Sequence, residues 1–359
     1  MQAVILAAGK STRAYPLTLT RPKPLLKAAN KAILEHNLDN LNGIADEIIL
    51  IVGYKKEMIK GQFGNKYKNL KLKYVEQKEQ LGTGHAASLA EPYIRDKFIL
   101  MAGDDIYSRK DIRKCIKYNY SILTSTVKNP SNASELRSKR TRSQLTNFGV
   151  IIQKKGILTD FVEKPKSFVS DTINTSLYTL DKKIFHCLKK IRKSERNELE
   201  LPDAIMLLSK SEKVHCVKAR QWLPIGYSWD LLKADRILGK NKNIIGKNSK
   251  IKGRIINSTI GDNCLIEGTV KNSVIMDNSV IGKNSVVEGS VIGENVHFSG
   301  TIKSKSNAYS AVNGKKVKIG RFGAVIGDNV IAKNTAIEAG CRIWPGKKIS
   351  NKIIKKDLI

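Results

Sequence analysis

The feature that most constrains the fold is a six-residue repeat of aliphatic residues in the last third of the chain. Ile275 is followed six positions later by Ile281, and Val287 follows six positions after that. Gly, Asn or Asp comes shortly after most of these aliphatic residues. Helical periodicity cannot produce this spacing, whereas short strands stacked into a three-sided prism bury one aliphatic side chain per face. Residues 239–359 are therefore predicted to form a β-helix of hexapeptide repeats.

The repeat is interrupted once. It continues late in the chain through Ile331, Ile337, Ile343 and Ile349, but it slips between Phe298 and Gly323. A prism tolerates an insertion at a corner between two of its strands. We therefore expect the segment between Phe298 and Gly323 to loop out of the prism.

Residues 1–238 follow a different pattern, in which apolar strands alternate with helices. Residues 3–6 and 47–52 are apolar runs of strand length, and apolar residues at helical spacing lie between them. Further strands are expected near residues 98–101, 148–153, 157–163, 173–180 and 214–218, and helices near 83–91, 182–191 and 201–208. This alternation predicts an α/β domain with a Rossmann-like, mostly parallel sheet.

Ligands of such sheets bind beyond the carboxyl ends of the strands. Residues 9–13 and 103–105 both follow predicted strands, so we expect these two polar clusters to meet. Residues 129–146 are rich in Ser, Asn, Lys and Arg, and are predicted to form a mobile surface loop.

The composition limits the possible partners. The net charge of +32 would favour phosphorylated ligands or acidic partners, but the lysines are spread along the chain and no nucleic-acid motif accompanies them. We therefore expect no specific nucleic-acid binding. The longest apolar run, residues 3–8, is too short for a membrane span and lacks the basic region of a secretory signal. The five cysteines form no Cys-x-x-Cys pair, so a cytoplasmic protein with reduced thiols is expected.

A glycine turn after the first strand carries the first chemical motif. Residues 6–13 are Leu-Ala-Ala-Gly-Lys-Ser-Thr-Arg, and Arg-Pro-Lys-Pro-Leu-Leu follows at residues 21–26. Such a turn lets backbone N–H groups approach phosphates, while Arg13 and Lys23 supply cations. Together with the β-helix pattern, these motifs resemble those of sugar-1-phosphate nucleotidylyltransferases with a C-terminal left-handed β-helix. The resemblance covers nearly the whole chain.

The resemblance implies roles for the residues of this signature. Arg13 would stabilise charge on the α-phosphate and the departing pyrophosphate, and Lys23 would orient the sugar phosphate. Nucleotide contacts would come from Leu6, Ala8 and Gly9. The family usually has Gly where this chain has Ser11, so we expect either a constrained backbone there or a hydrogen bond from Ser11 to a phosphate.

Residues 77–86, Gln-Lys-Glu-Gln-Leu-Gly-Thr-Gly-His-Ala, are similar to the base-binding segment of this family, particularly in uridylyltransferases. By this resemblance Gln77 would contact the base edge, Gly82 would let the base lie against the backbone, and Thr83 would complete the nucleotide site. The preferred donors are UTP and dTTP. We interpret His85 as a residue at the start of a helix, with no catalytic role.

Asp104 follows a predicted strand, where a carboxylate can hold Mg²⁺ against nucleotide phosphates. Asp105 is interpreted as a loop or capping residue, and Asp230 as the cap or start of a helix. Many relatives have a second acidic metal ligand where this chain has Pro224, so Asp104 is the metal ligand we predict. The resemblance also implies sugar contacts from Gly149, Glu163, Lys164, Asn174 and Thr175.

The leading hypothesis is an enzyme that makes a nucleotide sugar and pyrophosphate from a nucleoside triphosphate and glucose-1-phosphate or N-acetylglucosamine-1-phosphate. One alternative is a non-catalytic regulatory or assembly subunit of the same architecture. Another is a bifunctional enzyme with acetyltransferase activity in the β-helix. The resemblance places the base for that reaction where this chain has Val312, which accepts no proton, so acetyl transfer is not expected. Homo-oligomerisation through the β-helix is expected.

Overall fold

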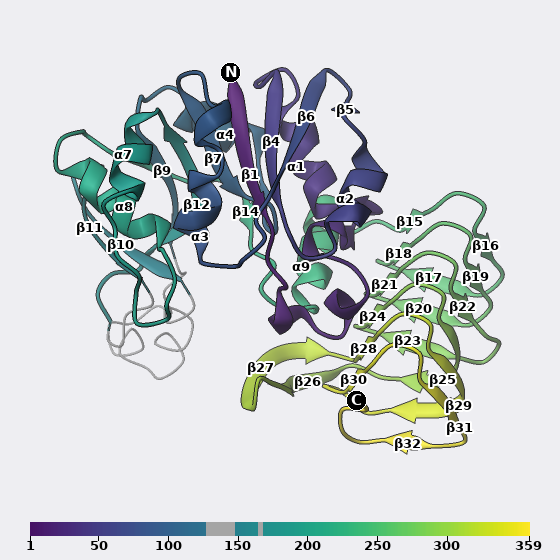
Figure 1. The fold of residues 1–359 in the computed structure, drawn as a ribbon. Helices are drawn as coiled ribbons and strands as arrows, with labels where there is room; N and C mark the ends of the chain where they lie inside the picture. The colour runs from purple at the N-terminus through teal and green to yellow at the C-terminus, as the bar shows by residue number, and fades with distance from the viewer. Residues whose placement is uncertain (127–147, 164–167) are drawn as a thin grey trace. The chain divides into compact units, whose positions relative to one another are not determined.

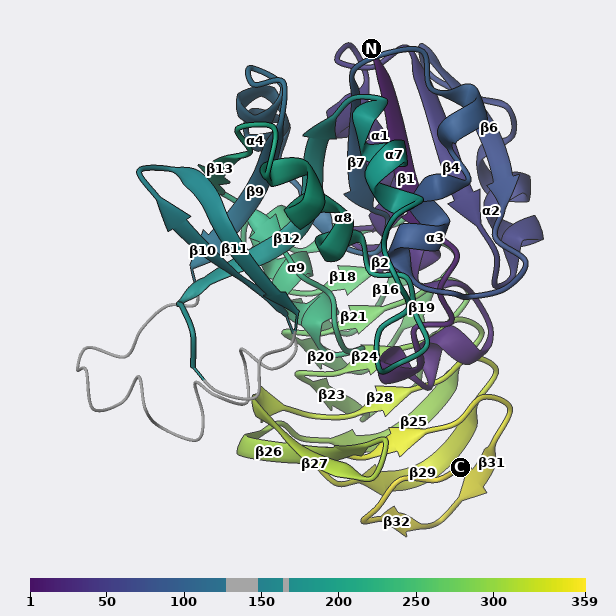
Figure 2. The same cartoon turned by 60° about the vertical axis from the view of Figure 1, so that its left-hand side comes forward.

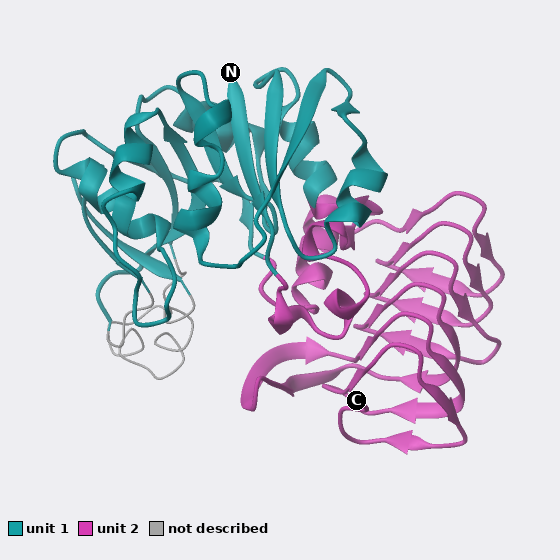
Figure 3. Ribbon diagram, in the orientation of Figure 1, with its two compact units in different colours: residues 1–9, 34–224 teal, residues 10–33, 225–359 magenta. Residues whose placement is uncertain are grey.

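The computed structural model describes residues 1–126, 148–163 and 168–359. The chain forms two compact units, and each contains two stretches of the sequence (Figure 3). Unit 1 comprises Met1–Gly9 and Leu34–Pro224, and unit 2 comprises Lys10–Ile33 and Ile225–Ile359. The division of the sequence into domains at residues 238 and 239 stays a prediction.

Unit 1 is built on a ten-stranded sheet (Figure 1). At its centre β1 (Gln2–Ala7) pairs in parallel with β4 (Glu47–Val52) and with β7 (Phe98–Ala102). These strands are buried and consist almost wholly of apolar residues, as expected for a parallel sheet covered on both faces. The order across the sheet is β10-β11-β13-β9-β12-β7-β1-β4-β6-β5. The predicted Rossmann-like α/β fold is confirmed, but the sheet is mixed rather than mostly parallel. The pairs β7–β1, β1–β4, β4–β6 and β13–β9 are parallel, whereas β12 and the strands at both ends of the sheet pair antiparallel with their neighbours.

Helices flank the sheet of unit 1, as the two views in Figures 1 and 2 show. The helices are α1 (Ile33–Leu41), α2 (Lys56–Phe63), α3 (Thr83–Ser88), α4 (Arg109–Cys115), α7 (Lys183–Leu188) and α8 (Leu201–Ser209). The other strands are β5 (Lys66–Tyr67), β6 (Leu70–Glu76), β8 (Ile106–Tyr107), β9 (Ser121–Thr126), β10 (Gly149–Lys154), β11 (Ile157–Glu163), β12 (Thr172–Leu180), β13 (His215–Lys218) and β14 (Trp222–Leu223). Helix α3 is shorter than predicted: the N–H of Ala90 bonds to the carbonyl of Ala87, three residues back, and residues 91–93 form a separate 3₁₀ turn. No helix among the described residues is long and apolar enough to cross a membrane.

The β-helix of unit 2 stacks short parallel strands into faces, as the six-residue repeat predicted. One face is the sheet β15-β18-β21-β24-β28-β30, in which Ile260 pairs with Ile275 and Ile275 with Ile292. These isoleucines are fully buried in the core of the prism. The strands of this face are β15 (Ile244–Ile245), β18 (Thr259–Ile260), β21 (Val274–Ile275), β24 (Val291–Ile292), β28 (Val325–Ile326) and β30 (Arg342–Ile343).

A second, larger sheet contains the remaining strands of the prism. Its longest members are β25 (His297–Ile302) and β29 (Ile331–Ile337). Each of them pairs along its length with two different shorter strands and so joins these into one sheet. The shorter strands are β16 (Lys250–Ile251), β17 (Arg254–Ile256), β19 (Leu265–Ile266), β20 (Thr269–Lys271), β22 (Val280–Ile281), β23 (Val286–Glu288), β31 (Lys348–Ser350) and β32 (Ile353–Ile354).

The predicted interruption of the prism is an antiparallel hairpin. Its strands β26 (Lys305–Val312) and β27 (Lys315–Phe322) pair only with each other among the described residues. The insertion begins later than the sequence indicated, because the side chains of Phe298 and Ile302 are buried in the prism core and keep β25 in the stack. Lys10–Ile33 also belongs to unit 2, together with β2 (Lys27–Ala28), β3 (Lys31–Ala32) and helix α9 (Asp230–Leu238).

Candidate active site

The carboxyl ends of β1 and β7 meet in unit 1. Leu6 lies opposite Ala102 in the parallel register, and the N–H of Gly103 donates a hydrogen bond to the carbonyl of Leu6 at 2.8 Å. A Cβ at Gly103 would lie 2.8 Å from Cγ2 of Ile5, so only glycine allows this approach. The structure therefore brings residues 6–9 next to residues 103–105, and Asp104 is half-buried there.

The segment that follows β6 lies against the same strand end. The carbonyl of Ala8 accepts hydrogen bonds from the N–H of Tyr54 at 3.0 Å and from Nε2 of Gln80 at 3.1 Å. The side-chain amide of Gln77 is buried, and its Nε2 lies 3.2 Å from the carbonyl of Gly82 and 3.1 Å from Nδ1 of His85. In the His85 tautomer with its hydrogen on Nε2, both hydrogens of the Gln77 amide have acceptors, and its Oε1 can receive a donor.

Gly82 and Thr83 form the start of α3 and pack against residues 199–201. Gly82 has a positive φ of 98°, and a Cβ there would lie 2.5 Å from the carbonyl oxygen of Leu199. Oγ1 of Thr83 accepts a hydrogen bond from the N–H of Leu201 at 3.2 Å. Glycine is therefore required at position 82, and His85 lies within the short helix α3, near the start that the sequence predicted.

The carboxylate of Asp105 accepts a hydrogen bond from the indole of Trp222. The strand β14 pairs with β8, and Nε1 of Trp222 donates to Oδ2 of Asp105 at 3.1 Å. Burial raises the pKa of Tyr107 well above its ordinary value, and the carboxylates of Asp105 and Asp104 raise it further.

No group of three metal-ligating side chains occurs within residues 1–126, 148–163 and 168–359. Asp104 offers a single half-buried carboxylate at the carboxyl end of β7.

Four of the predicted sugar contacts lie on adjacent strands of the sheet. Gly149 lies opposite Glu163, and a Cβ at Gly149 would lie 2.7 Å from a carboxylate oxygen of Glu163. Nδ2 of Asn174 donates to the hydroxyl of Tyr178 at 2.7 Å, and burial followed by the charge of Glu163 raises the pKa of that phenol. Thr175 is fully buried, and its hydroxyl donates to the carbonyl of Leu123 at 2.8 Å.

The fifth predicted sugar contact, Lys164, lies outside the described residues, as does the predicted loop at residues 129–146. Sequence reasoning missed Arg196, whose Nη2 lies 2.7 Å from Oε1 of Glu200 and 3.6 Å from Oε1 of Glu163. Arg196 therefore places a cation beside a predicted sugar contact. Its sequence surroundings carry no motif, so only its position in the fold reveals it.

The two predicted catalytic cations lie in unit 2. Ser11 has a left-handed φ of 51°, and its carbonyl accepts hydrogen bonds from the N–H of Ala14 and from Oγ1 of Thr18, both at 3.0 Å. The backbone at Ser11 is therefore constrained, which is one of the two expectations for this position. The guanidinium carbon of Arg13 lies 5.7 Å from the centroid of the Tyr227 ring, within cation–π range.

Lys23 is buried beside a carboxylate of the same unit. Asp230 begins α9, as predicted, and its Oδ2 accepts hydrogen bonds from the N–H groups of Gly226 at 2.9 Å and Tyr227 at 2.8 Å. Burial raises the pKa of Asp230, and these hydrogen bonds and the charge of Lys23 partly oppose the shift. Asp230 therefore stabilises a buried ammonium group, and its hydrogen bonds to the backbone make it a structural residue.

The chain thus joins a Rossmann-like α/β unit to a β-helix of hexapeptide repeats. The pattern of the nucleotidyl transferase family matches residues 2–241, and the pattern described as GlmU-like, C-terminal hexapeptide, matches residues 241–334. The chain therefore belongs to the nucleotidyl transferase family.

Named relatives include the "bifunctional protein GlmU" of Methanocaldococcus jannaschii, which is 40% identical over 263 residues. That alignment covers 71% of this chain and 60% of the relative, so the chain spans less than two thirds of its length. The "UTP--glucose-1-phosphate uridylyltransferase AglF" of Haloferax volcanii is 33% identical over 242 residues, which are 66% of this chain and 96% of the relative. A "bifunctional sugar-1-phosphate nucleotidylyltransferase/acetyltransferase" of Sulfurisphaera tokodaii is 31% identical over 269 residues, which are 71% of this chain and 61% of the relative.

Among solved structures, a UDP-glucose pyrophosphorylase complexed with UDP-glucose superimposes with a TM-score of 0.57 at 20% identity. The match covers 67% of this chain and 99% of that chain. At this identity the likeness shows the fold of the α/β part.

Proposed function

We propose that the chain transfers a nucleotidyl group from a nucleoside triphosphate to a sugar 1-phosphate, which yields a nucleotide sugar and pyrophosphate. The observation that carries this proposal is the meeting of residues 6–9, Gln77 and Asp104 at the strand ends of unit 1. This arrangement offers a backbone turn for phosphates, an amide for a base and a carboxylate for a metal ion within one region.

The chemistry is an in-line displacement. An oxygen of the sugar phosphate attacks the α-phosphorus, a new P–O bond forms, and the bond to the departing pyrophosphate breaks. No protein nucleophile is required. Arg13 stabilises the negative charge that grows on the α-phosphate and the leaving group, and Lys23 holds the sugar phosphate for attack.

The preferred nucleotides are UTP and dTTP. Because Gly82 and His85 take both hydrogens of the Gln77 amide, Oε1 of Gln77 would accept the N3–H of a bound base. Uracil and thymine carry this donor, whereas N3 of cytosine carries no hydrogen. The arrangement requires the His85 tautomer with its hydrogen on Nε2.

Mg²⁺ is the proposed cofactor, held by Asp104 and the phosphate oxygens. When bound, it would neutralise charge on the phosphates. Pro224 supplies no ligand atom, so Asp104 is the protein's proposed contribution to the metal site.

Glucose-1-phosphate and N-acetylglucosamine-1-phosphate are the proposed sugar substrates. Glu163 and Asn174 would orient sugar hydroxyls. Gly149 would let its strand lie close to Phe161 and Glu163, which a Cβ would approach to 2.4 Å and 2.7 Å. Lys164 is retained as a proposed contact. Thr175 would position the backbone around it and would not contact the sugar through its hydroxyl, since that hydroxyl already donates to the carbonyl of Leu123.

We further propose a cytoplasmic homo-oligomer that assembles through the β-helix, since stacked strands leave edges that need pairing or capping. Light scattering that finds a strict monomer would contradict this assembly. A regulatory or assembly subunit without activity is the competing hypothesis. For acetyl transfer, Val312 is buried at the end of β26 and offers no base.

The test is a panel in which the purified chain is incubated with Mg²⁺, one of several nucleoside triphosphates and one of several sugar phosphates, and pyrophosphate release is measured. Release is expected with UTP or dTTP only when a sugar 1-phosphate is present. Absence of release with every pair would favour the regulatory subunit.

A further inference from the structure

The segment Lys10–Ile33, which carries Arg13 and Lys23, belongs to the same compact unit as the β-helix (Figure 3). Its polar side chains contact successive turns of the prism. These contacts are an ion pair of Lys27 with Asp277, ion pairs of Arg21 with Glu294 and with Asp328, a hydrogen bond from Oγ1 of Thr20 to Oδ2 of Asp328 at 2.6 Å, and one from Nδ2 of Asn30 to the carbonyl of Ile260 at 2.7 Å.

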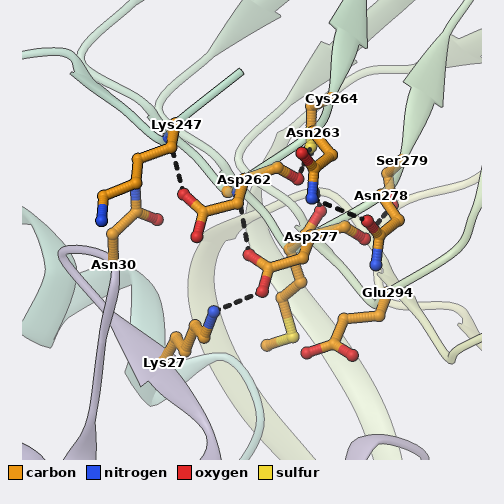
Figure 4. A network of polar contacts seen from close by, with 12 residues as sticks. Lys27, Asn30, Lys247, Asp262, Asn263, Cys264, Asp277, Asn278, Ser279 and Glu294 are labelled. Atoms are coloured by element: carbon orange, nitrogen blue, oxygen red, sulfur yellow. Dashed lines mark hydrogen bonds and ion pairs between the residues drawn. The ribbon is translucent and has the colours of Figure 1, made fainter. Parts of the chain in front are cut away.

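In both Asp277 and Asp328, the two carboxylate oxygens bind different parts of the chain. Oδ1 of Asp277 accepts a hydrogen bond from the N–H of Asp262 in the preceding turn at 2.9 Å, and Oδ2 pairs with Lys27 (Figure 4). Asp328 repeats the arrangement: its Oδ1 accepts from the N–H of Glu294 at 2.8 Å, and its Oδ2 pairs with Arg21. One oxygen therefore holds the prism together, and the other holds the segment.

The contact made by Arg21 is buried. The side chains of Arg21 and Asp328 are 9% and 3% exposed. Burial alone would lower the pKa of Arg21, but the hydrogen bonds and charges of Glu294 and Asp328 outweigh it and raise the pKa. Removing one charge from such a pair leaves the other buried without compensation, so loss of the pair destabilises this position of the segment around Arg21.

The anchor is coupled to a catalytic cation by stiff backbone. Lys23 lies two residues after Arg21, and its neighbours Pro22 and Pro24 have fixed φ angles. Pro22, the residue between them, cannot rotate about φ, so less of a displacement of Arg21 is absorbed before it reaches Lys23.

We propose that Arg21, which forms ion pairs with Glu294 and Asp328, is a positioning residue that fixes the place of Lys23 in nucleotidyl transfer. The β-helix therefore contributes to catalysis. This inference rests on the proposed function. It gives the β-helix a role within each chain, in addition to any role in assembly.

The test compares Asp328→Asn and Arg21→Lys with the unchanged protein. Asn at position 328 keeps an oxygen that can accept from the N–H of Glu294, but it removes the charge that pairs with Arg21. Lys at position 21 keeps the charge but lacks the planar guanidinium with which Arg21 binds Glu294 through Nη1 and Asp328 through Nη2. Each variant is expected to lower kcat roughly 10- to 100-fold, the scale for a small misplacement of reacting groups, with the KM for nucleotide unchanged. The double variant should lose little more than either single variant, since both disrupt one interaction.

Asp262→Asn is the matched control. Oδ1 of Asp262 accepts from the N–H of Lys247 at 2.7 Å, and within the part of the chain that the structure describes it makes no ion pair with Lys10–Ile33. This variant should keep full kcat. Hydrogen exchange supplies a second readout: Asp328→Asn should raise exchange in Lys10–Ile33 and leave the amides of the β-helix turns protected.

Three results would overturn the inference. They are full kcat in Asp328→Asn, an equal loss in Asp262→Asn, or a loss of kcat accompanied by loss of protection in the turns, which would indicate a purely structural role. If the unchanged protein transfers no nucleotide, the proposed function fails, and the exchange measurement still tests whether Asp328 holds the segment.

Discussion

Replacement of Gly82 by alanine should destabilise unit 1 and weaken nucleotide binding. With φ at 98° and ψ at 176°, Gly82 occupies a backbone region that is almost restricted to glycine, and another residue there costs about 1–3 kcal/mol. The new Cβ would also lie 2.5 Å from the carbonyl oxygen of Leu199 and 2.9 Å from Cβ of Glu198. Neither atom can rotate away, so overpacking adds about 1–3 kcal/mol. The free energy of unfolding should therefore fall by about 2–6 kcal/mol.

Thermal unfolding and UTP titration calorimetry measure the two effects. A loss of 1 kcal/mol corresponds to about 2–4 °C for a unit of this size, so Tm should fall by at least about 4 °C. UTP affinity should fall roughly tenfold, because the carbonyl that holds Gln77 is displaced. The control is Gly61→Ala in the middle of α2, where a Cβ meets nothing within 4 Å, and where about 0.4–1 kcal/mol of stabilisation is expected. A Gly82→Ala variant with unchanged Tm and unchanged UTP affinity would refute the reasoning.

Four further outcomes are expected. Arg13→Ala should lower turnover roughly 10²- to 10³-fold without unfolding, and a variant with full activity would remove Arg13 from the mechanism. Chelation of Mg²⁺ and Asp104→Asn should each abolish transfer, and metal-independent activity would contradict the proposed metal site. His85→Leu should reduce the preference for UTP over CTP in competition assays, whereas His85→Asn, which offers an acceptor in place of Nδ1, should retain it; equal behaviour of the two variants would count against the role of Nδ1. Acetyl-coenzyme A and glucosamine-1-phosphate should give no acetylated product, and a product that disappears in His297→Ala would show that a base has moved to that position.

The fold could be predicted because its two parts have different, strong periodicities. Apolar runs alternating with helical spacing predicted the sheet of unit 1, and β4 and β11 have the predicted bounds. The six-residue repeat predicted the buried isoleucines of the β-helix. The start of the hairpin insertion was misplaced because Phe298 and Ile302 fill core positions although the repeat has already slipped.

The site was only partly predictable. The strand-end position of residues 6–9 and 103–105 followed from the parallel sheet, since neighbouring carboxyl ends share one edge. The partners of single side chains did not follow. Nothing in the spacing indicates that the indole of Trp222 binds Asp105, because that contact depends on the pairing of β14 with β8. In the same way, the ion pair of Arg21 with Asp328 joins residues more than three hundred positions apart, and no local sequence pattern indicates it.

The central claim is nucleotidyl transfer, and ³¹P NMR of the purified chain with UTP, glucose-1-phosphate and Mg²⁺ tests it most directly. The claim predicts that the signals of both substrates decline together while the two coupled resonances of a diphosphate sugar and the signal of pyrophosphate grow in equal amounts. Growth of orthophosphate alone, or a spectrum that stays unchanged with glucose-1-phosphate and with N-acetylglucosamine-1-phosphate for both UTP and dTTP, would contradict it.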